Sequence, residues 1–199
     1  NRFAIKSTRS ELLFLEYIIE HLNPSGRAAV IVPEGINFVA NNAYRKIRKK
    51  LIDDNYLIAD ISLPHGVFKP YASVKTHILI IDRPLARLSK SVLFVEIEND
   101  GYTQTDRREP IEGSEIEEAL RHVLTYKNAL SANVVWEQPG GKIRSYSIQK
   151  KEIMSYANAP LIGRWFDLPN RVVHRSDLPL RKLGDLCDIR DGQSENMAS

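Results

Sequence analysis

The stretch RAAVIVP, residues 27–33, decides the fold class of this 199-residue chain. A short, continuous apolar run of this kind predicts a strand that is buried on both faces of a parallel sheet. The segment before it, STRSELLFLEYIIEHLNPSG, has Leu12, Leu15 and Ile19 at helical spacing, and a Ser or Thr ahead of the apolar stripe can cap a helix there. A helix followed by a buried strand is half of a β-α-β unit.

A second helix is predicted directly after this strand. The segment NNAYRKIRKKLIDDN places Tyr44, Ile47 and Leu51 on one face. The other face is basic and carries Arg45, Lys46, Arg48, Lys49 and Lys50. We expect these charges to be the solvated face of a surface helix. The alternative is a phosphate-binding stripe, since clustered Lys and Arg supply the sequence-independent part of DNA affinity.

Two further apolar runs, YLIADISLP and THILIID, predict strands that are separated only by the loop HGVFKPYASVK. Because a parallel return needs a crossover of about a dozen residues or more, we expect the second of these strands to run antiparallel. SVLFVEIE, residues 91–98, predicts a further edge strand. The alternation of helices and strands indicates an α/β fold.

The alternation stops beyond Asn99. GSEIEEALRHVLTYKNAL predicts one more helix, and the remainder is punctuated by Pro and Gly. We therefore place a domain boundary within residues 110–130. The resulting parts are residues 1–125, a connecting region at 126–175 and a last segment at 176–199.

Composition excludes several classes of protein. Hydrophobic residues at 43% and charged residues at 27% set aside disordered and collagen-like chains, and a formal net charge of +3 is too small to identify a nucleic-acid binder. The single cysteine, Cys187, cannot form an intramolecular disulfide, and no Cys/His cluster has the spacing of metal ligands. No apolar run approaches the roughly 20 residues that span a bilayer. We expect a cytoplasmic protein and, because the chain begins at Asn1 rather than at Met, a piece of a longer one.

Three blocks of sequence resemble the modification subunit of type I restriction systems and its single-chain relatives. The blocks are ELLFLEYIIEHLNPSGRAAVIVPEGINF, ISLPHGVFKPYASVKTHILIID and NDGYTQTDRREPI, and they occur in the order of that family. Together they extend over roughly residues 10–113. Each apolar block alone is a weak signal, but the combination is specific.

The resemblance implies a doubly wound methyltransferase sheet that binds S-adenosylmethionine and transfers its methyl group to the N6 amine of adenine in DNA. In that family a Gly-rich loop holds the cofactor and an Asn/Asp-Pro-Pro-Tyr/Phe motif holds the amine. The sequence contains neither a Gly-rich strand-to-helix turn nor a Pro-Pro pair. We therefore expect the second half of the sheet, with an antiparallel last strand and a helical or irregular C-terminal extension. The amine is a poor nucleophile without the acceptors of the missing motif, so we expect no catalytic residue here and no methyl transfer by the chain alone.

The loop HGVFKPYASVKT contains the residues that we expect to hold the target base. Enzymes that modify a base of duplex DNA extrude it and stack it on aromatic or apolar side chains. In similar adenine methyltransferases an aromatic residue of this loop stacks on the extruded adenine. The match in register is Phe68, and Tyr71 is a second candidate. The alternative is that Phe68 is a core residue that closes the end of the sheet.

The same loop supplies candidate DNA contacts. Lys75 and Thr76 stand at the start of the following strand, where an ammonium and a hydroxyl can contact phosphate and sugar. His65 and Lys69 can line the DNA-facing rim. The alternatives are a solvated lysine at a strand start and an incidental surface histidine.

The turn PEGINF follows the first predicted strand. In an open α/β sheet the ligand crevice lies at the carboxyl ends of the strands, so we assign Pro33, Glu34 and Gly35 to the wall of the target-base pocket. The alternative is a tight turn with an exposed carboxylate. The run DRREP, residues 106–110, fits equally well a contact with DNA or a partner and charge pairing within a loop.

The end of the chain resembles further parts of the family. SYSIQKKEIMSYANAPLIGRWFD is similar to the region that follows the catalytic domain, and LPLRKLGDLCDIRDGQS is similar to the start of a target-recognition domain. The resemblance implies DNA as a partner, with specificity and restriction subunits or domains. Two functions stay open: a methyltransferase fragment that supplies the pocket wall and DNA contacts, and a non-catalytic α/β module for assembly with DNA-binding or restriction subunits. The absence of a Walker loop and of GxGxxG disfavours a nucleotide hydrolase or dehydrogenase.

Overall fold

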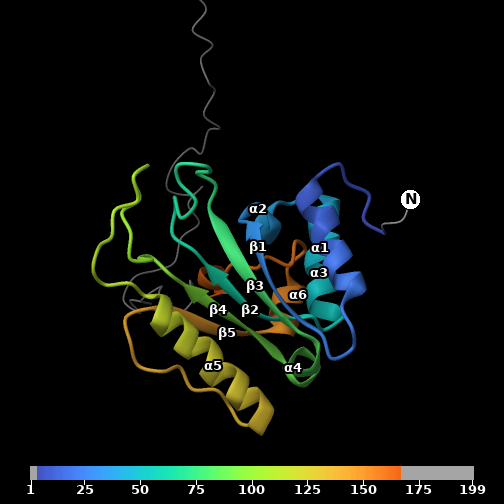
Figure 1. Cartoon of the computed structure of the whole chain (residues 1–199). Coiled ribbons are helices and arrows are strands. Elements are labelled where there is room, and N and C mark those ends of the chain that lie inside the picture. The colour runs from blue at the N-terminus through green and yellow to red at the C-terminus, as the bar shows by residue number, and fades with distance from the viewer. Residues whose placement is uncertain (1–3, 167–199) are drawn as a thin grey trace, which may run out of the picture. The chain divides into compact units, whose positions relative to one another are not determined.

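Five strands form one mixed sheet with helices on both faces in the computed structural model, which describes residues 4–166 (Figure 1). All of these residues belong to one unit, Asn1–Asp167. The segment 176–199, which resembles the start of a target-recognition domain, lies outside the described residues. The predicted α/β class is confirmed.

The sheet is built around an antiparallel strand. Its strand order is β1 (Arg27–Pro33), β3 (Thr76–Asp82), β2 (Leu57–Ser62), β4 (Ser91–Glu96) and β5 (Arg144–Gln149). β3 runs antiparallel to both of its neighbours, β2 and β4 are parallel, and β5 is antiparallel to β4. The predicted direction of the THILIID strand is therefore confirmed, and its cause is the short, helix-free return from β2.

Strand β1 is the edge of the described sheet and pairs with β3 alone. The prediction of a strand that is buried on both faces of a parallel sheet is wrong, because exposure alternates along β1 and Ile31 is 55% exposed. The sequence does not reveal this alternation, since apolar side chains occupy exposed and covered positions alike.

Strand β4 is an interior strand, so the prediction that SVLFVEIE forms an edge is also wrong. β4 lies between β2 and β5, and its residues Val92 to Glu96 are buried. The outer position belongs to β5, which the sequence analysis missed. Its sequence RSYSIQ is mostly polar, because the buried positions of this edge strand are few.

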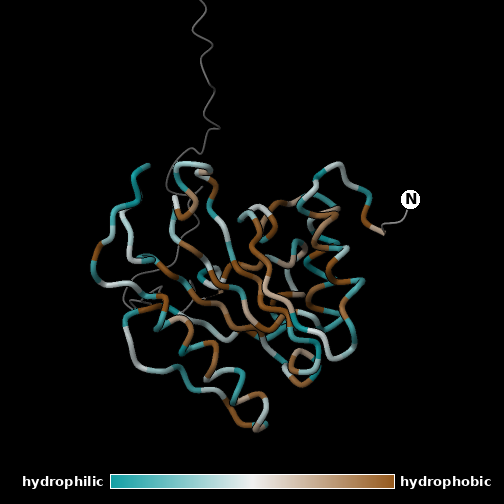
Figure 2. The backbone as a smooth tube through the Cα atoms, viewed as in Figure 1, coloured by the Kyte–Doolittle hydropathy of each residue, from teal (hydrophilic) through white to brown (hydrophobic). Residues whose placement is uncertain are grey.

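Helices cover both faces of the sheet. One face carries α1 (Ser10–His21), α2 (Gly35–Phe38), α3 (Asn42–Asp53) and α6 (Lys150–Ser155). The other carries α4 (Arg83–Leu88) and α5 (Ile116–Ala132). Hydrophobic residues concentrate in the strands and on the inner sides of the helices (Figure 2). None of the helices within the described residues is long and apolar enough to cross a membrane.

The two long helices of the first face begin differently. Helix α1 has Arg9 at its N-cap position, with no side-chain capping bond, so the expected Ser or Thr cap is wrong. Helix α3 begins after Asn41, whose Oδ1 accepts hydrogen bonds from the backbone N–H groups of Ala43 (3.0 Å) and Tyr44 (3.1 Å). This cap satisfies two of the N–H groups that a helix start leaves unpaired.

Arg48 of α3 is fully buried, which contradicts the prediction that all five basic residues of this helix are solvated. Its guanidinium donates hydrogen bonds to three backbone carbonyl oxygens, those of Ile36 (2.7 Å), Val39 (2.9 Å) and Asn158 (3.0 Å). Burial, with a smaller effect from Arg45, lowers the pKa of Arg48 to about 10. The side chain ties α3 to α2 and to the segment that follows α6.

Replacing Arg48 tests this link. We expect Arg48→Ala to lower the free energy of unfolding by about 3 kcal/mol, because it leaves three carbonyl oxygens without donors in a buried site. Lys46→Ala, on the exposed side of the same helix, should change it by less than about 0.5 kcal/mol. Urea unfolding of the chain and both variants gives the comparison, and equal midpoints for the two variants would contradict the assigned role.

Lys150, at the start of α6, is a second cation that the protein partly shields from water. Its Nζ donates to the carbonyl oxygen of Ala86 (2.6 Å) and to Oδ1 of Asn55 (2.9 Å). Burial lowers the pKa of Lys150 from 10.5 to about 8. Between these two values the unfolded chain binds more protons than the folded chain, so the contribution of Lys150 to stability rises with pH in this window.

A pH series tests the burial of Lys150. Because the ammonium is only partly shielded from water, we expect it to contribute a rise of about 1–2 kcal/mol in the free energy of unfolding above about pH 8. Lys150→Met should remove this rise, whereas Lys151→Met, at an exposed position, should keep it. Urea unfolding at about pH 7.5 and pH 9.5 measures the difference, and identical profiles for chain and Lys150→Met would refute it.

The boundary that the sequence analysis places between residues 125 and 126 falls within α5. The strand β5 follows this helix and pairs with β4 in the same sheet. The division into a methyltransferase part and a connecting region stays a prediction.

Candidate functional site

The predicted site residues lie where strands begin or end on one side of the sheet, which is called here the loop edge to distinguish it from the edge strand β1. β1 ends at Pro33, opposite Thr76 where β3 begins. β2 and β4 are parallel and end together, with Ser62 opposite Glu96. Two loops extend from this edge, 63–75 and 97–115 (Figure 1). Ligand crevices of α/β sheets lie at such an edge.

Loop 63–75 exposes its aromatic side chains. Tyr71 is 95% exposed and Phe68 is 36% exposed, so Phe68 is not a buried core residue. The backbone N–H of Tyr71 donates to the carbonyl oxygen of Phe68 (2.9 Å), which holds both in one turn. His65 is exposed in the same loop, and Nζ of Lys69 lies 3.4 Å from Oδ1 of Asp106 in loop 97–115. The stacking and DNA-contact roles of these residues stay predictions.

The predicted pocket wall and the predicted strand-start contacts come together. The backbone N–H of Glu34 donates to the carbonyl oxygen of Lys75 (2.9 Å), and Nζ of Lys75 lies 3.4 Å from Oε1 of Glu34. Thr76 is buried, and its Oγ1 has no hydrogen-bond partner. Gly35 begins helix α2 directly behind Glu34. Pro33 to Gly35 and Lys75 to Thr76 therefore form one continuous rim.

A buried polar cluster lies behind this rim, and the sequence analysis missed it. Oδ1 of Asp60 lies 2.6 Å from Nδ1 of His77, and Oδ2 of Asp60 accepts a hydrogen bond from Nδ2 of Asn37 (2.7 Å). All three residues are less than 5% exposed. Asp60 and His77 interrupt the apolar runs of β2 and β3, and this interruption is the signal that could have identified them.

The cluster borders a small cavity. Nε2 of His77 has no hydrogen-bond partner and lies 3.8 Å from Oε1 of Glu34. The cavity has a volume of about 20 Å³, roughly the room for one water molecule, and its charged or titratable lining residues are Glu34, Asp60, Lys75, His77, Glu96 and Arg164. An open groove of about 410 Å³ adjoins it and shares Lys75, Glu96 and Arg164.

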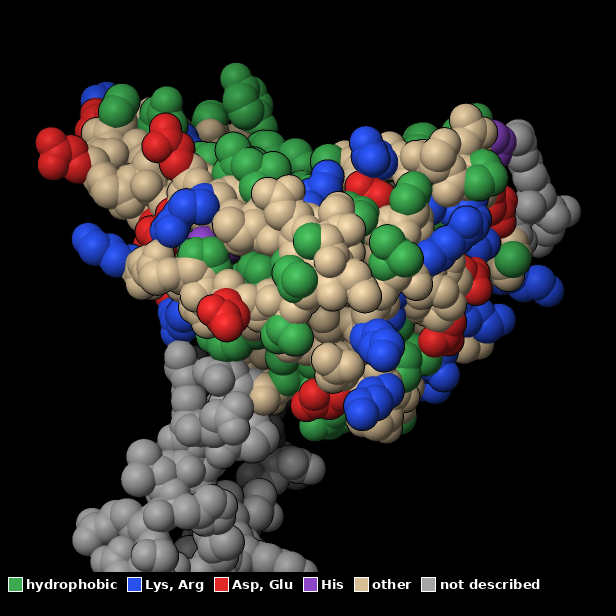
Figure 3. Space-filling model, turned by 90° about the horizontal axis from the view of Figure 1, so that it is seen from below, with side chains coloured by type: hydrophobic (Ala, Val, Ile, Leu, Met, Phe, Trp, Pro, Cys, Tyr) green, Lys and Arg blue, Asp and Glu red, His purple; other side chains and the backbone are tan. Residues whose placement is uncertain are grey.

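Opposite charges are paired around this groove. Nε of Arg164 lies 3.1 Å from Oε1 of Glu96, and Nε of Arg144 lies 3.6 Å from Oε2 of the same carboxylate. In loop 97–115, Arg108 pairs with Asp100, so charge pairing within the loop accounts for one arginine of DRREP. On the face seen in Figure 3, basic and acidic side chains are likewise interspersed.

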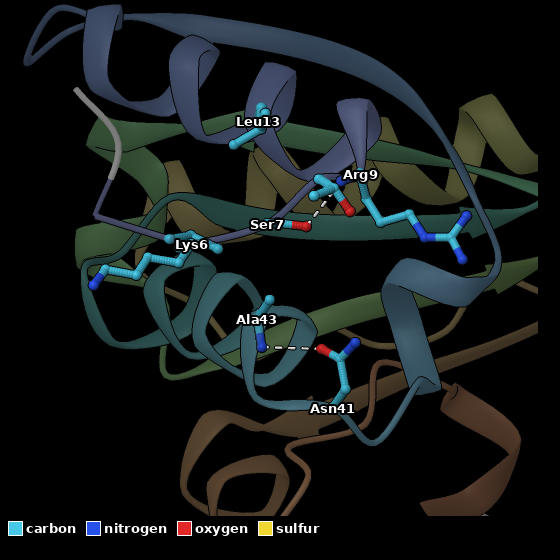
Figure 4. A pocket seen from close by; sticks show the side chains of 8 residues that line it. Lys6, Ser7, Arg9, Leu13, Asn41 and Ala43 are labelled. Atoms are coloured by element: carbon cyan, nitrogen blue, oxygen red, sulfur yellow. Dashed lines mark hydrogen bonds between the residues drawn. The ribbon is translucent and has the colours of Figure 1, made fainter. Parts of the chain in front are cut away.

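A larger hollow lies at the N-terminal segment, away from the predicted residues. It has a volume of about 630 Å³, and Figure 4 shows Lys6, Ser7, Arg9, Leu13, Asn41 and Ala43 among its lining residues. The Ser7 and Asn41 side chains there are engaged by nearby backbone, since each accepts a hydrogen bond from an N–H group. None of the residues that the sequence analysis selects lines this hollow.

A comparison with protein families identifies the class of protein. The profile of the family described as N-6 DNA Methylase matches residues 2–152, and the chain therefore belongs to this family. The family consists of S-adenosylmethionine-dependent adenine-N6 DNA methyltransferases. The resemblance to type I modification subunits is confirmed.

Particular relatives are methylase subunits of type I restriction enzymes. The chain is 37% identical over 106 residues to the EcoEI methylase subunit of Escherichia coli, covering 53% of this chain and 21% of that protein. It is 38% identical over 82 residues to the EcoKI methylase subunit of the same species, covering 41% of this chain and 15% of that protein. The chain thus spans about a fifth or less of the length of these relatives.

Solved structures of this class share the fold. A structure that describes complex assembly of a type I restriction–modification system matches 89% of this chain and 35% of its own chain, with a TM-score of 0.62 and 27% identity. A modification subunit of a type I enzyme from Vibrio vulnificus matches 75% of this chain and 29% of its own, with a TM-score of 0.52 and 26% identity. The methyltransferase subunit from Streptococcus thermophilus, at 22% identity and a TM-score of 0.59, shows the fold alone.

Proposed function

We propose that this chain is the target-base half of a site-specific adenine-N6 DNA methyltransferase of a restriction–modification system. The observation that carries the proposal is the exposure of Phe68 and Tyr71 on a loop that leaves the same sheet edge as the rim of Glu34 and Lys75. An extruded base needs an aromatic platform next to polar groups, and this edge offers both.

The geometry of loop 63–75 supports a stacking role for Phe68. Its ring is partly exposed, so one part is held by the protein and another can meet a base. Tyr71 is almost fully exposed and can contribute to the same platform or to the flanking DNA. Base–aromatic stacking is worth about 1–3 kcal/mol per base, which offsets part of the few kcal/mol that extrusion of a base costs.

The rim and loop 63–75 supply the candidate DNA contacts. Lys75 and Lys69 are cations that a phosphate can bind, and each is held by a carboxylate, Glu34 or Asp106. His65 is exposed at the base of the loop, and Thr76 places its unpaired hydroxyl behind Lys75. In this proposal Pro33, Glu34 and Gly35 form the pocket wall.

The open edge of β1 supports membership in a larger sheet. Its outward N–H and C=O groups have no strand partner among the described residues, and Ile31 is exposed beside them. Helix α1 also has an apolar hollow of about 290 Å³ around Leu13 and Phe14, with Phe14 exposed. An unprotected edge strand is a template for another strand, and we propose that a preceding part of the parent protein occupies it.

The described residues do not fit S-adenosylmethionine. A nucleotide-type cofactor needs a Gly-rich turn between a strand and a helix, where backbone approaches it closely. Among the strand-to-helix connections within residues 4–166, β1 to α2 has Gly35, and β3 to α4 and β5 to α6 have no glycine. The connection from β4 to α5 is the long loop 97–115, where Gly101 and Gly113 are isolated glycines and form no Gly-rich turn. We therefore propose that the cofactor and the residues that hold the amine belong to the parent's other part, and that this chain alone is inactive.

A second candidate function rests on helix α5. Ile116, Leu120 and Leu124 recur every four residues on this helix and are each about half exposed. Such a stripe is a surface for a partner helix. It supports contact with specificity or restriction subunits, either within a methyltransferase or as a non-catalytic assembly module. An intact Asn/Asp-Pro-Pro-Tyr/Phe motif in the parent would exclude the purely non-catalytic module.

A substitution in the parent enzyme tests the stacking role. We expect Phe68→Ala to lower the rate of adenine methylation about tenfold or more, because the extruded base loses its platform. Val74→Ala changes an exposed apolar residue of the same loop and should leave the rate near that of the unaltered enzyme. Radiolabelled methyl transfer to a duplex that contains the target site provides the rates, and an unchanged rate for Phe68→Ala would exclude stacking.

Reconstitution tests the half-sheet. We expect calorimetry to find no stoichiometric, micromolar binding of S-adenosylmethionine by these 199 residues. Addition of the preceding part of the parent, produced as a separate chain, should restore cofactor binding and methyl transfer, because it completes the sheet at β1. An Ile31→Lys variant should impair this assembly, and Val135→Lys, at an exposed position remote in sequence, serves as the control. Tight cofactor binding by the chain alone would contradict the proposal.

A further inference from the structure

The hydrogen positions in the buried cluster are assigned here for an ionised Asp60. Asp60 faces two nitrogen atoms, Nδ1 of His77 at 2.6 Å and Nδ2 of Asn37 at 2.7 Å, one for each of its oxygens. Asn37 donates through its amide, so a carboxylate at Asp60 requires a proton on Nδ1 of His77. Nδ2 of Asn37 also lies 2.8 Å from Nδ1, and this contact is a hydrogen bond only if Nδ1 carries no proton. With an ionised Asp60 at 2.6 Å, we assign the proton to Nδ1. In its neutral form His77 therefore presents an unprotonated Nε2 to the cavity.

Glu34 stands between two nitrogen atoms. Its Oε1 lies 3.4 Å from Nζ of Lys75 and 3.8 Å from Nε2 of His77. When the imidazole is neutral, Nζ of Lys75 is the only cation of the two. Nε2 of His77 and Oε1 of Glu34 are then both hydrogen-bond acceptors, and no proton lies between them. A protonated imidazole would turn this contact into an attractive one. Nε2 would then donate a hydrogen bond to Glu34, and His77 would be held between the carboxylates of Asp60 and Glu34.

This arrangement links the imidazole to the rim cation. We propose that His77 is a positioning residue for DNA binding: when Lys75 exchanges Glu34 for a DNA phosphate, His77 takes up a proton and binds the released Glu34. The inference rests on the proposed function, since it takes Lys75 as a phosphate contact. The proton comes from solvent and goes to Nε2, and no covalent bond other than this N–H forms.

The driving force is electrostatic. With Glu34 bound to Lys75, the cation at the rim is neutralised and its attraction for phosphate is reduced. Release of Glu34 without a new donor would leave a carboxylate only about a third exposed against an unprotonated imidazole. Protonated His77 removes this cost.

Other charges around His77 do not replace Glu34. The elements packed about the cavity contribute Asp60 from β2, Glu96 from β4 and Arg164 from the segment after α6. Asp60 is bound to Nδ1, and Glu96 is paired with Arg164 and Arg144. Within the described residues, Glu34 is the carboxylate for which His77 Nε2 and Lys75 compete.

The first test measures the pH dependence of binding to a duplex oligonucleotide of about 14 base pairs. Fluorescence anisotropy of the 199-residue chain at low salt should show affinity that rises toward acid pH, by up to about tenfold per pH unit for one coupled proton. Calorimetry in buffers of different ionisation enthalpy should measure an uptake of close to one proton for each DNA duplex that the chain binds. His77→Asn, whose amide can donate to Glu34 without a proton, should bind with a flatter pH profile and less uptake. His21→Asn, on α1, is the matched control and should keep the full profile.

A second variant changes Glu34 and leaves the buried cluster of Asn37, Asp60 and His77 intact. Glu34→Gln changes a partly exposed residue, so the fold should persist if His77→Asn proves unstable. Because glutamine no longer binds a cation, the proton uptake should disappear and affinity at neutral pH should increase severalfold. Unchanged uptake in Glu34→Gln would overturn the inference.

Further outcomes separate the inference from the proposed function. If Lys75→Gln leaves DNA affinity unchanged, or the chain does not bind the duplex, the DNA contact itself fails. If Lys75→Gln weakens binding but His77→Asn keeps the full pH profile, the contact stands and the coupling fails. Nitrogen NMR of neutral His77 gives an independent check, because a proton found on Nε2 instead of Nδ1 would let it bind Glu34 without proton uptake and would overturn the coupling.

Discussion

Strand β3 runs antiparallel to both β1 and β2, and this pairing determines where the site is built. The start of β3 is brought beside the ends of its two neighbours, so Lys75 and Thr76 meet Pro33 and Glu34 although about 40 residues of chain separate them. A parallel strand would have placed its start at the opposite edge. The rim, the loop that carries Phe68 and the buried histidine all depend on this single reversal of direction.

Buried polar groups hold the elements that surround this edge. Arg48 joins two helices and a distant segment through backbone carbonyls, and Asp60 joins α2 to β3 through Asn37 and His77. Such groups add specificity of arrangement, because the hydrogen bonds that Arg48 and Asp60 make form in one packing only. They also explain why a four-residue helix such as α2, too short to be stable alone, keeps its place behind the rim.

Local pattern predicted much of the fold from the sequence. The apolar spacing of α1 and α3, the run of β3 and its antiparallel return are properties of short segments, and they were found correctly. Strand order is different, because it depends on pairing between distant segments. β1 was therefore mistaken for an interior strand and β4 for an edge, and the polar strand β5 was not seen.

The residues of the rim could be predicted from the sequence, whereas the buried polar cluster behind it could not. Glu34 follows from the rule that ligands gather at the carboxyl ends of strands, and Lys75 from its place at the start of the strand after loop 63–75. The structure places their side chains 3.4 Å apart. The cluster of Asn37, Asp60 and His77 needed the register, since only the pairing of β2 with β3 brings two polar interruptions of apolar runs together. Likewise, Arg48 reads as one solvated cation among five until the carbonyls around it are known.

The unpaired side of β1 also bears on how a parent protein would acquire this fold. In a parent whose strand next to β1 is encoded before Asn1, that strand would leave the ribosome first. Its backbone N–H and C=O groups would stay unpaired on one side until β1 is synthesised. β1 would then add to an existing sheet rather than start one, and β3, which emerges some 40 residues later, would close the other side. Synthesis of these 199 residues alone would remove this order and leave an apolar edge strand open to self-association at high protein concentration.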